Sequence, residues 1–223
     1  TADGAVNFVN VAVGALGTLV PESQVFLMNY VLPDNSAAVT DLLSSEALLR
    51  GDLGAAFADK GLRLQTLFSE GPQVWTTNRL VRSPADLKGF KMRGMVSPVL
   101  LDAYADLGYM IWAGEQELVT AIMAGDDWYQ GLPAHRQQLI DETIGGMNGY
   151  IAEAVQQYNA ERLQAIKAAK PDMQIVQLSE AEREVFRQAS QKTHEKVGEH
   201  LGARGKKLLA SILQEVAKAE RAN

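Results

Sequence analysis

The sequence contains no cysteine, which excludes disulfide bonds and thiol catalysis. It also has no run of eighteen apolar residues, so a transmembrane helix is not expected. Acidic side chains outnumber basic ones, 27 to 21, and the net charge is -6. A nucleic-acid-binding surface would need clustered lysine and arginine, and this balance argues against one. A small anionic ligand stays compatible with the composition, because one nearby arginine can outweigh a distant net charge.

Catalytic patterns are missing as well. The sequence has neither the Gly-x-Ser-x-Gly elbow of a serine hydrolase nor a phosphate-binding P-loop. His194 and Glu195 begin a zinc signature, but its second histidine would fall at position 198, which is Gly198. His200 would lie on a different helix face from His194. We therefore expect a protein that is not an enzyme and that holds no metal or cofactor.

The chain is nevertheless long enough and apolar enough to bury a substantial core, as one large domain or two small ones. Hydrophobic residues make up 47% of its 223 positions and charged residues 22%. Segments with strand and helix patterns alternate over the first 125 residues, which predicts α/β units and a largely parallel sheet. The expected strands are 6–13, 25–32, 62–68, 73–78, 90–93 and 109–112, with a turn at 70–72, and the expected helices are 37–49, 53–60, 98–107 and 115–124.

The last hundred residues have a helical pattern instead. Pro133 is suited to open a helix that reaches about residue 170, which is longer than one small lobe because a helix rises about 1.5 Å per residue. We interpret this helix as a strut between two lobes, with a bend allowed by its three clustered glycines. A short strand is expected at 173–178. Ser179 and Glu182 form a capping-box pattern that starts a helix to about residue 200, and a last helix covers 206–222.

Residues 83–93 are the segment around which the chain is organised. Ser83 is suited to cap a single helical turn, and Gly89 is suited to end it. The alternating residues 90–93 then predict a short strand that ends at Arg93, and Ser97 caps the next helix. Ligands of open α/β sheets bind at such strand ends. A guanidinium at this place matches a carboxylate, with which it forms two parallel hydrogen bonds.

The run Asp86-Leu87-Lys88-Gly89-Phe90-Lys91-Met92-Arg93 resembles the signature of TRAP-transporter solute-binding proteins, the periplasmic receptors of the C4-dicarboxylate type. Residues 4–7, 20–33, 60–64, 76–79 and 108–125 resemble further family segments in the same order. The resemblance implies a two-lobe α/β fold like that of periplasmic binding proteins, the Venus flytrap, with a long helix bridging the lobes. Residues 1–74 would form part of lobe one, 75–125 lobe two, and 126–223 a helical region with the bridging helix at about 134–170.

The sequence departs from the family pattern at two places. The opening strand and helix of the family do not precede the segment at residue 4. The family stretch "V-D-G-x-E" and the strands after it do not follow Gly125, because residues 125–127 lead almost directly into 128–133, which resembles a much later family segment. We therefore expect this sequence to be a fragment of a longer family member, without a visible signal peptide.

The resemblance implies that Arg93 binds the carboxylate of the ligand, although an ordinary salt bridge is the alternative for any arginine. Gln73 stands where some relatives carry a second arginine, and it is either a neutral hydrogen-bond donor or an exposed strand residue. Ser97 can cap its helix alone or also direct backbone amides at an anion. Gly94 is followed by two apolar residues, from which we expect a partly apolar acid.

Three further residues complete the predicted site. Trp75 and Trp112 can stack on a ligand, although large aromatic residues more often lie in the core. Glu117 matches a family position, and the alternative is that it only complements a helix dipole. For each of these residues the structural role and the ligand-binding role stay open at this point.

The resemblance further implies an extracytoplasmic receptor in the periplasm that binds a small organic anion and delivers it to the membrane permease of a TRAP transporter. The protein would be peripheral to the membrane, with no nucleic-acid partner. Two alternatives stay open: a ligand-sensing domain of the same architecture, and an α/β enzyme with Glu117 or Asp126 as a base. A third possibility is a domain-swapped assembly, for which the long helix is the natural place.

Overall fold

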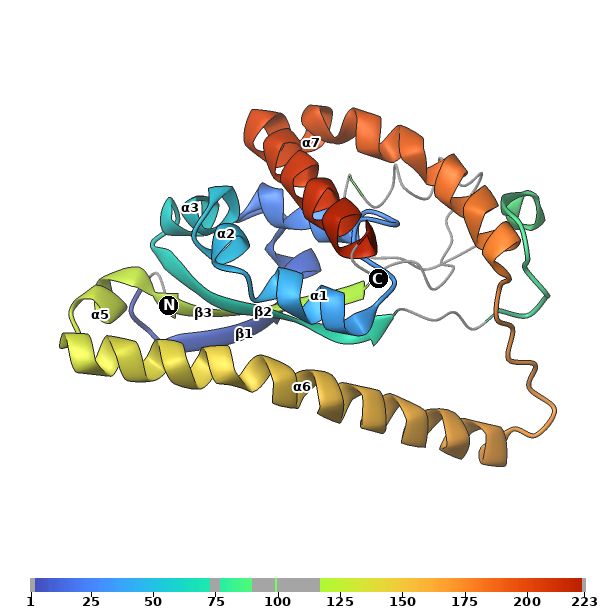
Figure 1. Ribbon diagram of the computed structural model, residues 1–223, viewed down its shortest axis with the longest axis horizontal. Coiled ribbons are helices and arrows are strands. Elements are labelled where there is room, and N and C mark those ends of the chain that lie inside the picture. The colour runs from blue at the N-terminus through green and yellow to red at the C-terminus, as the bar shows by residue number, and fades with distance from the viewer. Residues whose placement is uncertain (1–2, 73–76, 90–98, 100–116, 222–223) are drawn as a thin grey trace.

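The computed structural model describes residues 3–72, 77–89, 99 and 117–221. Within these residues β1 (Phe8–Ala12), β2 (Leu62–Pro72) and β3 (Glu117–Gly125) form one sheet in the order β1-β3-β2, and β3 pairs antiparallel with both neighbours (Figure 1). Phe8 lies opposite Ala124, and Pro72 lies opposite Glu117. The expectation of a largely parallel sheet is therefore wrong for the described residues.

The central strand β3 is the main correction to the predicted elements, because its sequence was assigned to a helix at 115–124. Val119, Ala121 and Met123 are all buried and belong to the hydrophobic core. They alternate with Thr120 and Ile122, as side chains do along a strand. The segment combines good helix formers with β-branched residues, so its own preference is ambiguous. Pairing on both edges decides in favour of the strand.

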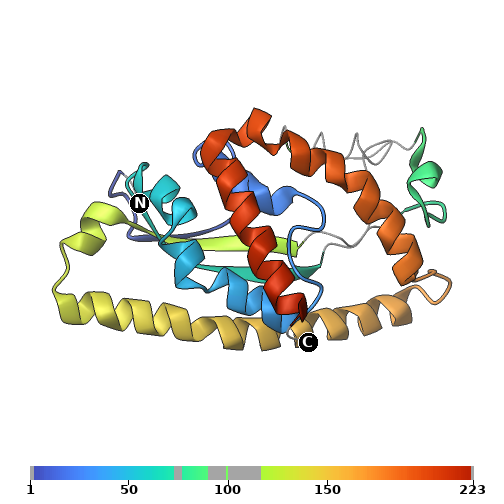
Figure 2. The same ribbon diagram turned by 45° about the horizontal axis from the view of Figure 1, so that its top comes forward.

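Two short 3-10 helices and three α-helices follow β1. Figures 1 and 2 show the α-helices and α7 (Glu180–Arg221) on one side of the sheet, while α6 (Ala134–Ala169) runs along the other. Asn35 caps the first α-helix, accepting hydrogen bonds from the backbone amides of Ala37 and Ala38 at 2.9 and 3.1 Å. The elements are η1 (Val13–Leu16), η2 (Pro21–Leu27), α1 (Ser36–Leu43), α2 (Glu46–Leu49) and α3 (Asp52–Ala58).

The strand predicted at 25–32 is not formed. Residues 25–27 belong to η2, and Tyr30 has a left-handed backbone with φ 56°. Every residue from Val25 to Met28 is buried. A segment that is buried on all sides reads as an uninterrupted apolar run, and such a run cannot distinguish a strand from a helical turn.

The remaining predictions differ mainly at the boundaries. The helix predicted at 37–49 is interrupted at Ser44 and Ser45, because Ser45 caps α2. The turn expected at 70–72 is an irregularity inside β2, with Gly71 at φ 99°. Residues 77 and 78 are not in a strand, while 73–76 and the strands expected at 90–93 and 109–112 lie outside the described residues. Of the helix expected at 98–107, only Val99 is described, and it is helical and buried.

The C-terminal part follows the predicted helices closely. After the short α5 (Asp126–Gln130), α6 is continuous over 36 residues, including its glycine cluster. Residues 173–178 do not form the predicted strand. Ser179 and Glu182 form the predicted capping box, with the backbone amide of Ser179 2.7 Å from the Glu182 carboxylate. The helix α7 kinks at Gly202, where φ is 65°, which confirms a break between two helices.

Candidate functional site

The strands β2 and β3 define the place where the predicted site joins the sheet. Because Pro72 at the end of β2 lies opposite Glu117 at the start of β3, residues 73–116 leave and re-enter the sheet side by side. We call this end of the two strands the sheet edge and residues 73–116 the excursion. Glu117 is the first residue of β3, whereas the sequence pattern placed it in a helix. The other predicted site residues all belong to this excursion, and they lie outside the described residues: Gln73, Trp75, Arg93, Ser97 and Trp112.

The end of β2 is held in a defined shape by α6. The amide of Gly71 donates to Ser69 Oγ at 2.9 Å, and Asn159 Nδ2 donates to the carbonyl oxygen of Glu70 at 3.3 Å. A Cβ atom on Gly71 would lie 2.6 Å from Asn159 Nδ2, and φ is 99° there. Only glycine adopts this backbone without strain and allows the helix so close. The conformation of the last residues of β2 is thus fixed before the chain leaves the sheet.

A second contact ties β2 to β3 at the same edge. Thr120 Oγ1 donates to the Glu70 carboxylate at 2.6 Å, and Thr120 is buried. A hydrogen bond to a charged acceptor is stronger than one between neutral groups. The two chain segments that enter and leave the excursion are therefore joined by a side-chain bond as well as by the strand ladder.

A cavity of about 270 Å³ lies beside this edge, between α1, the end of β2 and α6. Two of its polar side chains bond to each other, because Gln156 Nε2 donates to Ser36 Oγ at 2.8 Å. No charged residue is among the described residues that line it, so it suits an apolar group and supplies no cation for a carboxylate. The lining residues are Ser36, Val39, Thr40, Leu67, Phe68, Ser69, Gly71, Pro72, Asn148, Ala152, Val155, Gln156 and Asn159.

One polar pair at the cavity was not predicted. Asn148 is only 4% exposed, and its amide exchanges two hydrogen bonds with the Thr66 hydroxyl, at 2.8 and 3.1 Å. Buried polar groups need such partners because an unpaired one is costly. Asn148 occupies a position on the inner face of α6, between the half-buried Ile144 and Ile151. This polar residue within an apolar stripe is the signal that sequence reasoning could have used.

The other end of β2 contains a compact polar cluster, far from the excursion. Tyr129 donates to Asp141 Oδ2 at 2.7 Å, and the Arg63 guanidinium lies 4.2 Å from the centre of the Tyr129 ring. Burial is the main reason that the pKa of Tyr129 is raised. Asp126, considered above as a base, starts α5, and its carboxylate accepts a hydrogen bond from Gln130 at 3.4 Å. These contacts join α5 and α6 to the sheet.

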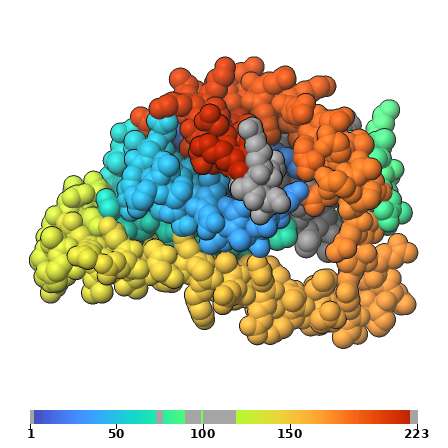
Figure 3. Space-filling model, viewed as in Figure 1, coloured from blue at the N-terminus to red at the C-terminus, as the bar shows by residue number. Residues whose placement is uncertain are grey.

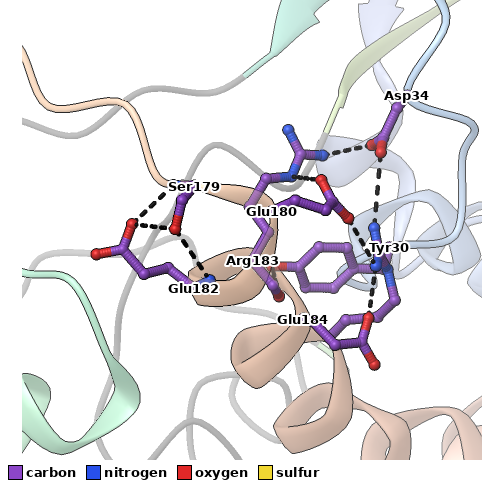
Figure 4. A network of polar contacts seen from close by, with 8 residues as sticks. Tyr30, Asp34, Ser179, Glu180, Glu182, Arg183 and Glu184 are labelled. Carbon is purple, nitrogen blue, oxygen red and sulfur yellow. Dashed lines mark hydrogen bonds and ion pairs between the residues drawn. The ribbon is translucent and has the colours of Figure 1, made fainter.

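The start of α7 is bonded to the segment 77–89, which belongs to the same excursion. Arg82 Nη1 lies 2.9 Å from the Glu182 carboxylate. The capping bonds from Ser179, together with Arg82, lower the pKa of Glu182 to about 2. In the same turn Arg183 contacts Asp34 at 2.5 Å, and its carbonyl oxygen accepts a hydrogen bond from the Tyr30 hydroxyl (Figure 4). The first turn of α7 therefore connects the excursion with the loop before α1.

Comparison with known proteins identifies this architecture as that of a bacterial solute receptor. The family described as bacterial extracellular solute-binding protein, family 7 (DctP), matches residues 1–113 and 108–200, and the chain belongs to this family. The two matched segments overlap at residues 108–113, whereas the sequence pattern places the missing family segment after Gly125. Membership confirms the recognised family and the expectation of a solute-binding protein, because the family consists of receptors and not of enzymes.

Two curated relatives are ectoine receptors. The ectoine/5-hydroxyectoine-binding periplasmic protein UehA of Ruegeria pomeroyi is 27% identical over 97% of this chain and 76% of its own length. The ectoine-binding periplasmic protein TeaA of Halomonas elongata is 24% identical over 94% of this chain and 73% of its own length.

Solved structures confirm the fold. TeaA without ligand superimposes with a TM-score of 0.88 at 23% identity, covering 98% of this chain and 84% of that one. A TRAP periplasmic solute-binding protein of Desulfovibrio salexigens with bound orotic acid has a TM-score of 0.84 at 20% identity, covering 97% and 82%. The chain therefore has the two-lobe fold of TRAP binding proteins, with a long helix as predicted. None of the helices in the described ranges is long and apolar enough to cross a membrane.

Proposed function

We propose that this protein is a periplasmic receptor that binds a small organic acid between its two lobes and delivers it to a TRAP permease. The observation that carries the proposal is the pairing of Pro72 with Glu117, which gives the excursion 73–116 one common base on the sheet. The second lobe is proposed for residues 75–125; because 117–125 form the central strand β3 of the sheet, it is the part up to residue 116 that this base attaches. Residues 1–74 contribute to the first lobe, residues 126–223 form the helical region, and α6 is the strut between the lobes.

The class of ligand follows from what the relatives bind. The similar proteins bind ectoine, orotic acid, succinate or galactonate, and all four compounds carry a carboxylate. Arg93 supplies the fixed positive charge that pairs with this group through two hydrogen bonds. Burying a carboxylate without such a partner is costly, so the arginine selects for acids as well as attracting them.

The remaining predicted residues surround this charge pair. Gln73 follows the end of β2 directly and donates a neutral hydrogen bond to the ligand. Ser97 directs the amides at its helix start towards the anion. Trp75 and Trp112 stack on the apolar part of the ligand, and Glu117 at the start of β3 accepts hydrogen bonds from its polar substituents. The apolar cavity beside the sheet edge agrees with a partly apolar acid.

Ligand binding favours a closed arrangement of the lobes to the extent that the ligand binds that arrangement more tightly. The hinge is the sheet edge at Pro72 and Glu117. Its geometry is fixed by the Glu70–Thr120 bond and by the contact of Asn159 with the end of β2. The closed form is the one that the permease recognises.

A thermal-shift screen with ectoine, orotate, succinate and galactonate tests this function. A ligand at 100 times its dissociation constant stabilises the protein by about 2.7 kcal/mol, which is easily measured. We expect at least one acid to raise the melting temperature, and the variant Arg93→Ala to lose the shift. Arg136→Ala, at an exposed position on α6, is the matched control and should keep it. Undiminished acid binding by Arg93→Ala would contradict the arginine's role, and no shift with any carboxylic acid would contradict the proposed ligand class.

A further inference from the structure

Asn148 and Gly149 form a pair whose chemistry the proposed function does not use. Asparagine is a chemically labile residue, and of all the asparagines in the chain only Asn148 is followed by glycine. The backbone nitrogen of the next residue can attack an asparagine side chain, and glycine has no Cβ atom to hinder the approach. The pair lies in the middle of α6, which Figure 3 shows along one side of the molecule. The reaction to consider at this place is deamidation.

Deamidation is a ring closure followed by hydrolysis. The Gly149 nitrogen forms a bond to Cγ of Asn148, its proton passes through solvent to the side-chain amide, and ammonia leaves. Water then adds to one of the two carbonyl carbons of the cyclic imide and opens the ring. The product is aspartate or isoaspartate. Water is consumed and ammonia is released, so the reaction needs no oxidant and no other co-reactant.

The folded structure protects the pair in two ways. Asn148 is 4% exposed, and its amide exchanges two hydrogen bonds with the Thr66 hydroxyl, at 2.8 and 3.1 Å. α6 is continuous through this point, so the Gly149 nitrogen donates its hydrogen within the helix ladder. Ring closure requires the ladder bond and the Thr66 bonds to break. Deamidation therefore needs α6 to leave β2 and to unwind locally.

The residues around the pair favour such a local opening. Gly145, Gly146 and Gly149 lie within five consecutive positions, and glycine is a poor helix former. A Cβ atom on any of them would meet nothing within 4 Å, so packing does not compensate for the missing side chains. Asn148 is the one buried residue among the described positions of α6. Segments with few buried contacts open far more often than the core does.

We propose that Asn148 is a deamidation site whose reaction is gated by the docking of α6 on β2. The gate is the pair of hydrogen bonds between Asn148 and Thr66, together with the helix ladder around it. While α6 is docked, the reaction is blocked. Each local opening at the glycines makes it possible. The proposal concerns the contact between α6 and the sheet, and it does not depend on the proposed ligand.

The product keeps the gate open. A carboxylate at position 148 no longer has the amide hydrogens that Asn148 donates to Thr66. The neighbouring cavity has no charged residue among the described residues that line it, so it offers no cation, and burying a carboxylate unpaired is costly. Isoaspartate also adds a carbon atom to the backbone, which interrupts the helix ladder. The strut thus passes from a docked to an undocked form that does not revert.

Mass spectrometry of the peptide that contains residue 148 tests the gate. The full chain is incubated in mildly alkaline buffer below its melting temperature, and a second sample is incubated in urea. We expect deamidation in urea and almost none in the folded protein. Gly149→Ala should slow the reaction several-fold in urea, where only the local chemistry counts. No deamidation in urea, or equal rates in the folded and the unfolded chain, would overturn the proposal.

A pair of variants distinguishes local opening from global unfolding. Thr66→Val removes the partner of Asn148 and should accelerate deamidation of the folded protein by about tenfold. The matched control Leu209→Ala removes a buried contact of α7 and destabilises the whole fold, but the rate should stay near that of the parent. Gly145→Ala with Gly146→Ala strengthens the helix and should slow the reaction several-fold. Equal acceleration by Thr66→Val and Leu209→Ala, or none by Thr66→Val, would overturn the gate.

Hydrogen exchange tests the effect of the product. The deamidated protein gains a negative charge, so anion exchange separates it from the parent. Its backbone amides in α6 around residue 148 should exchange faster than those of the parent, while the amides of β3 should be unchanged. Asn148→Asp should give the same pattern. Unchanged protection of α6 in the deamidated protein would contradict an undocked product.

Discussion

The two long helices α6 and α7 are attached to the same sheet domain in different ways. α7 buries a row of large apolar side chains, which includes Phe186, Leu209 and Ile212. α6 has one buried residue among its 36 described positions, Asn148, and otherwise touches β2 with half-buried side chains. α7 is thus part of the core, while α6 is a strut held by polar contacts, of which the Asn148–Thr66 pair is the buried one. The difference indicates that α7 is needed for stability and α6 for the geometry between sheet and lobes.

The largest effect should come from the core contacts of α7. Replacing the fully buried Phe186 with alanine removes a large side chain and leaves a cavity, which typically costs about 3–5 kcal/mol. Leu163→Ala, at an exposed position on α6, should cost well under half of this. Urea unfolding followed by circular dichroism measures both. Equal losses for the two variants would contradict the distinction between the helices.

The polar pair of α6 should have the next largest effect. Asn148→Ala leaves the buried Thr66 hydroxyl without its partner, which costs about 1–3 kcal/mol. Adding Thr66→Val removes that unsatisfied group, so the double variant should regain part of the stability. A double-mutant cycle in urea measures the coupling between the two residues. Additive losses would show that the pair does not fix α6 to the sheet.

The same comparison shows how far the sequence could predict the fold. The capping box at Ser179 and the extent of α6 were predicted, because each depends on residues close together in the chain. The strand β3 was not, since its conformation depends on pairing with β1 and β2, which no local pattern contains. The buried run 25–28 was misassigned for a related reason, because complete burial removes the alternation that marks a strand.

The candidate site was predictable only in part. The sequence motif indicates which residues belong to it, and the family membership confirms the class of protein. The common base at Pro72 and Glu117 could not be predicted, since it depends on the register between two strands forty-five positions apart. Asn148 was missed although its place within an apolar stripe marks it, and its partner Thr66 could be identified only from the structure.

A smaller change, which increases the stability of the protein, is expected from a glycine substitution in α6. Gly149→Ala should stabilise the protein by up to about 1 kcal/mol, because alanine favours the helix and its Cβ atom would meet nothing within 4 Å. Gly205→Ala in α7 is the contrasting variant, since its Cβ would lie 2.2 Å from Leu201 Cβ, and it should destabilise. Thermal denaturation distinguishes the two. A loss of stability in Gly149→Ala would indicate that α6 needs local flexibility.

The smallest effect concerns pH and His194 in α7. Burial lowers the pKa of this imidazole below its ordinary value of 6.5, although its Nε2 lies 2.7 Å from the carbonyl oxygen of Asn29. The unfolded chain therefore takes up this proton first as the pH falls. Stability from this group is present above pH 6.5 and is lost on acidification through the lower, folded-state pKa. Melting temperatures of His194→Gln should depend less on pH in this window than those of the parent. An unchanged pH dependence would contradict this assignment.

The account rests on closure of the segment 73–116 over an acid held by Arg93, and a distance measurement tests it most directly. The cysteine-free chain can carry spin labels at Leu80→Cys in the excursion and Ala47→Cys in α2, both at exposed positions. Electron spin resonance should show a shorter distance between the labels when a binding acid is added. In the same labelled protein with Arg93→Ala, the acid should leave the distance unchanged. A distance that is identical with and without a bound acid would contradict closure, and a distance that shortens equally in the Arg93→Ala protein would contradict the role of the arginine.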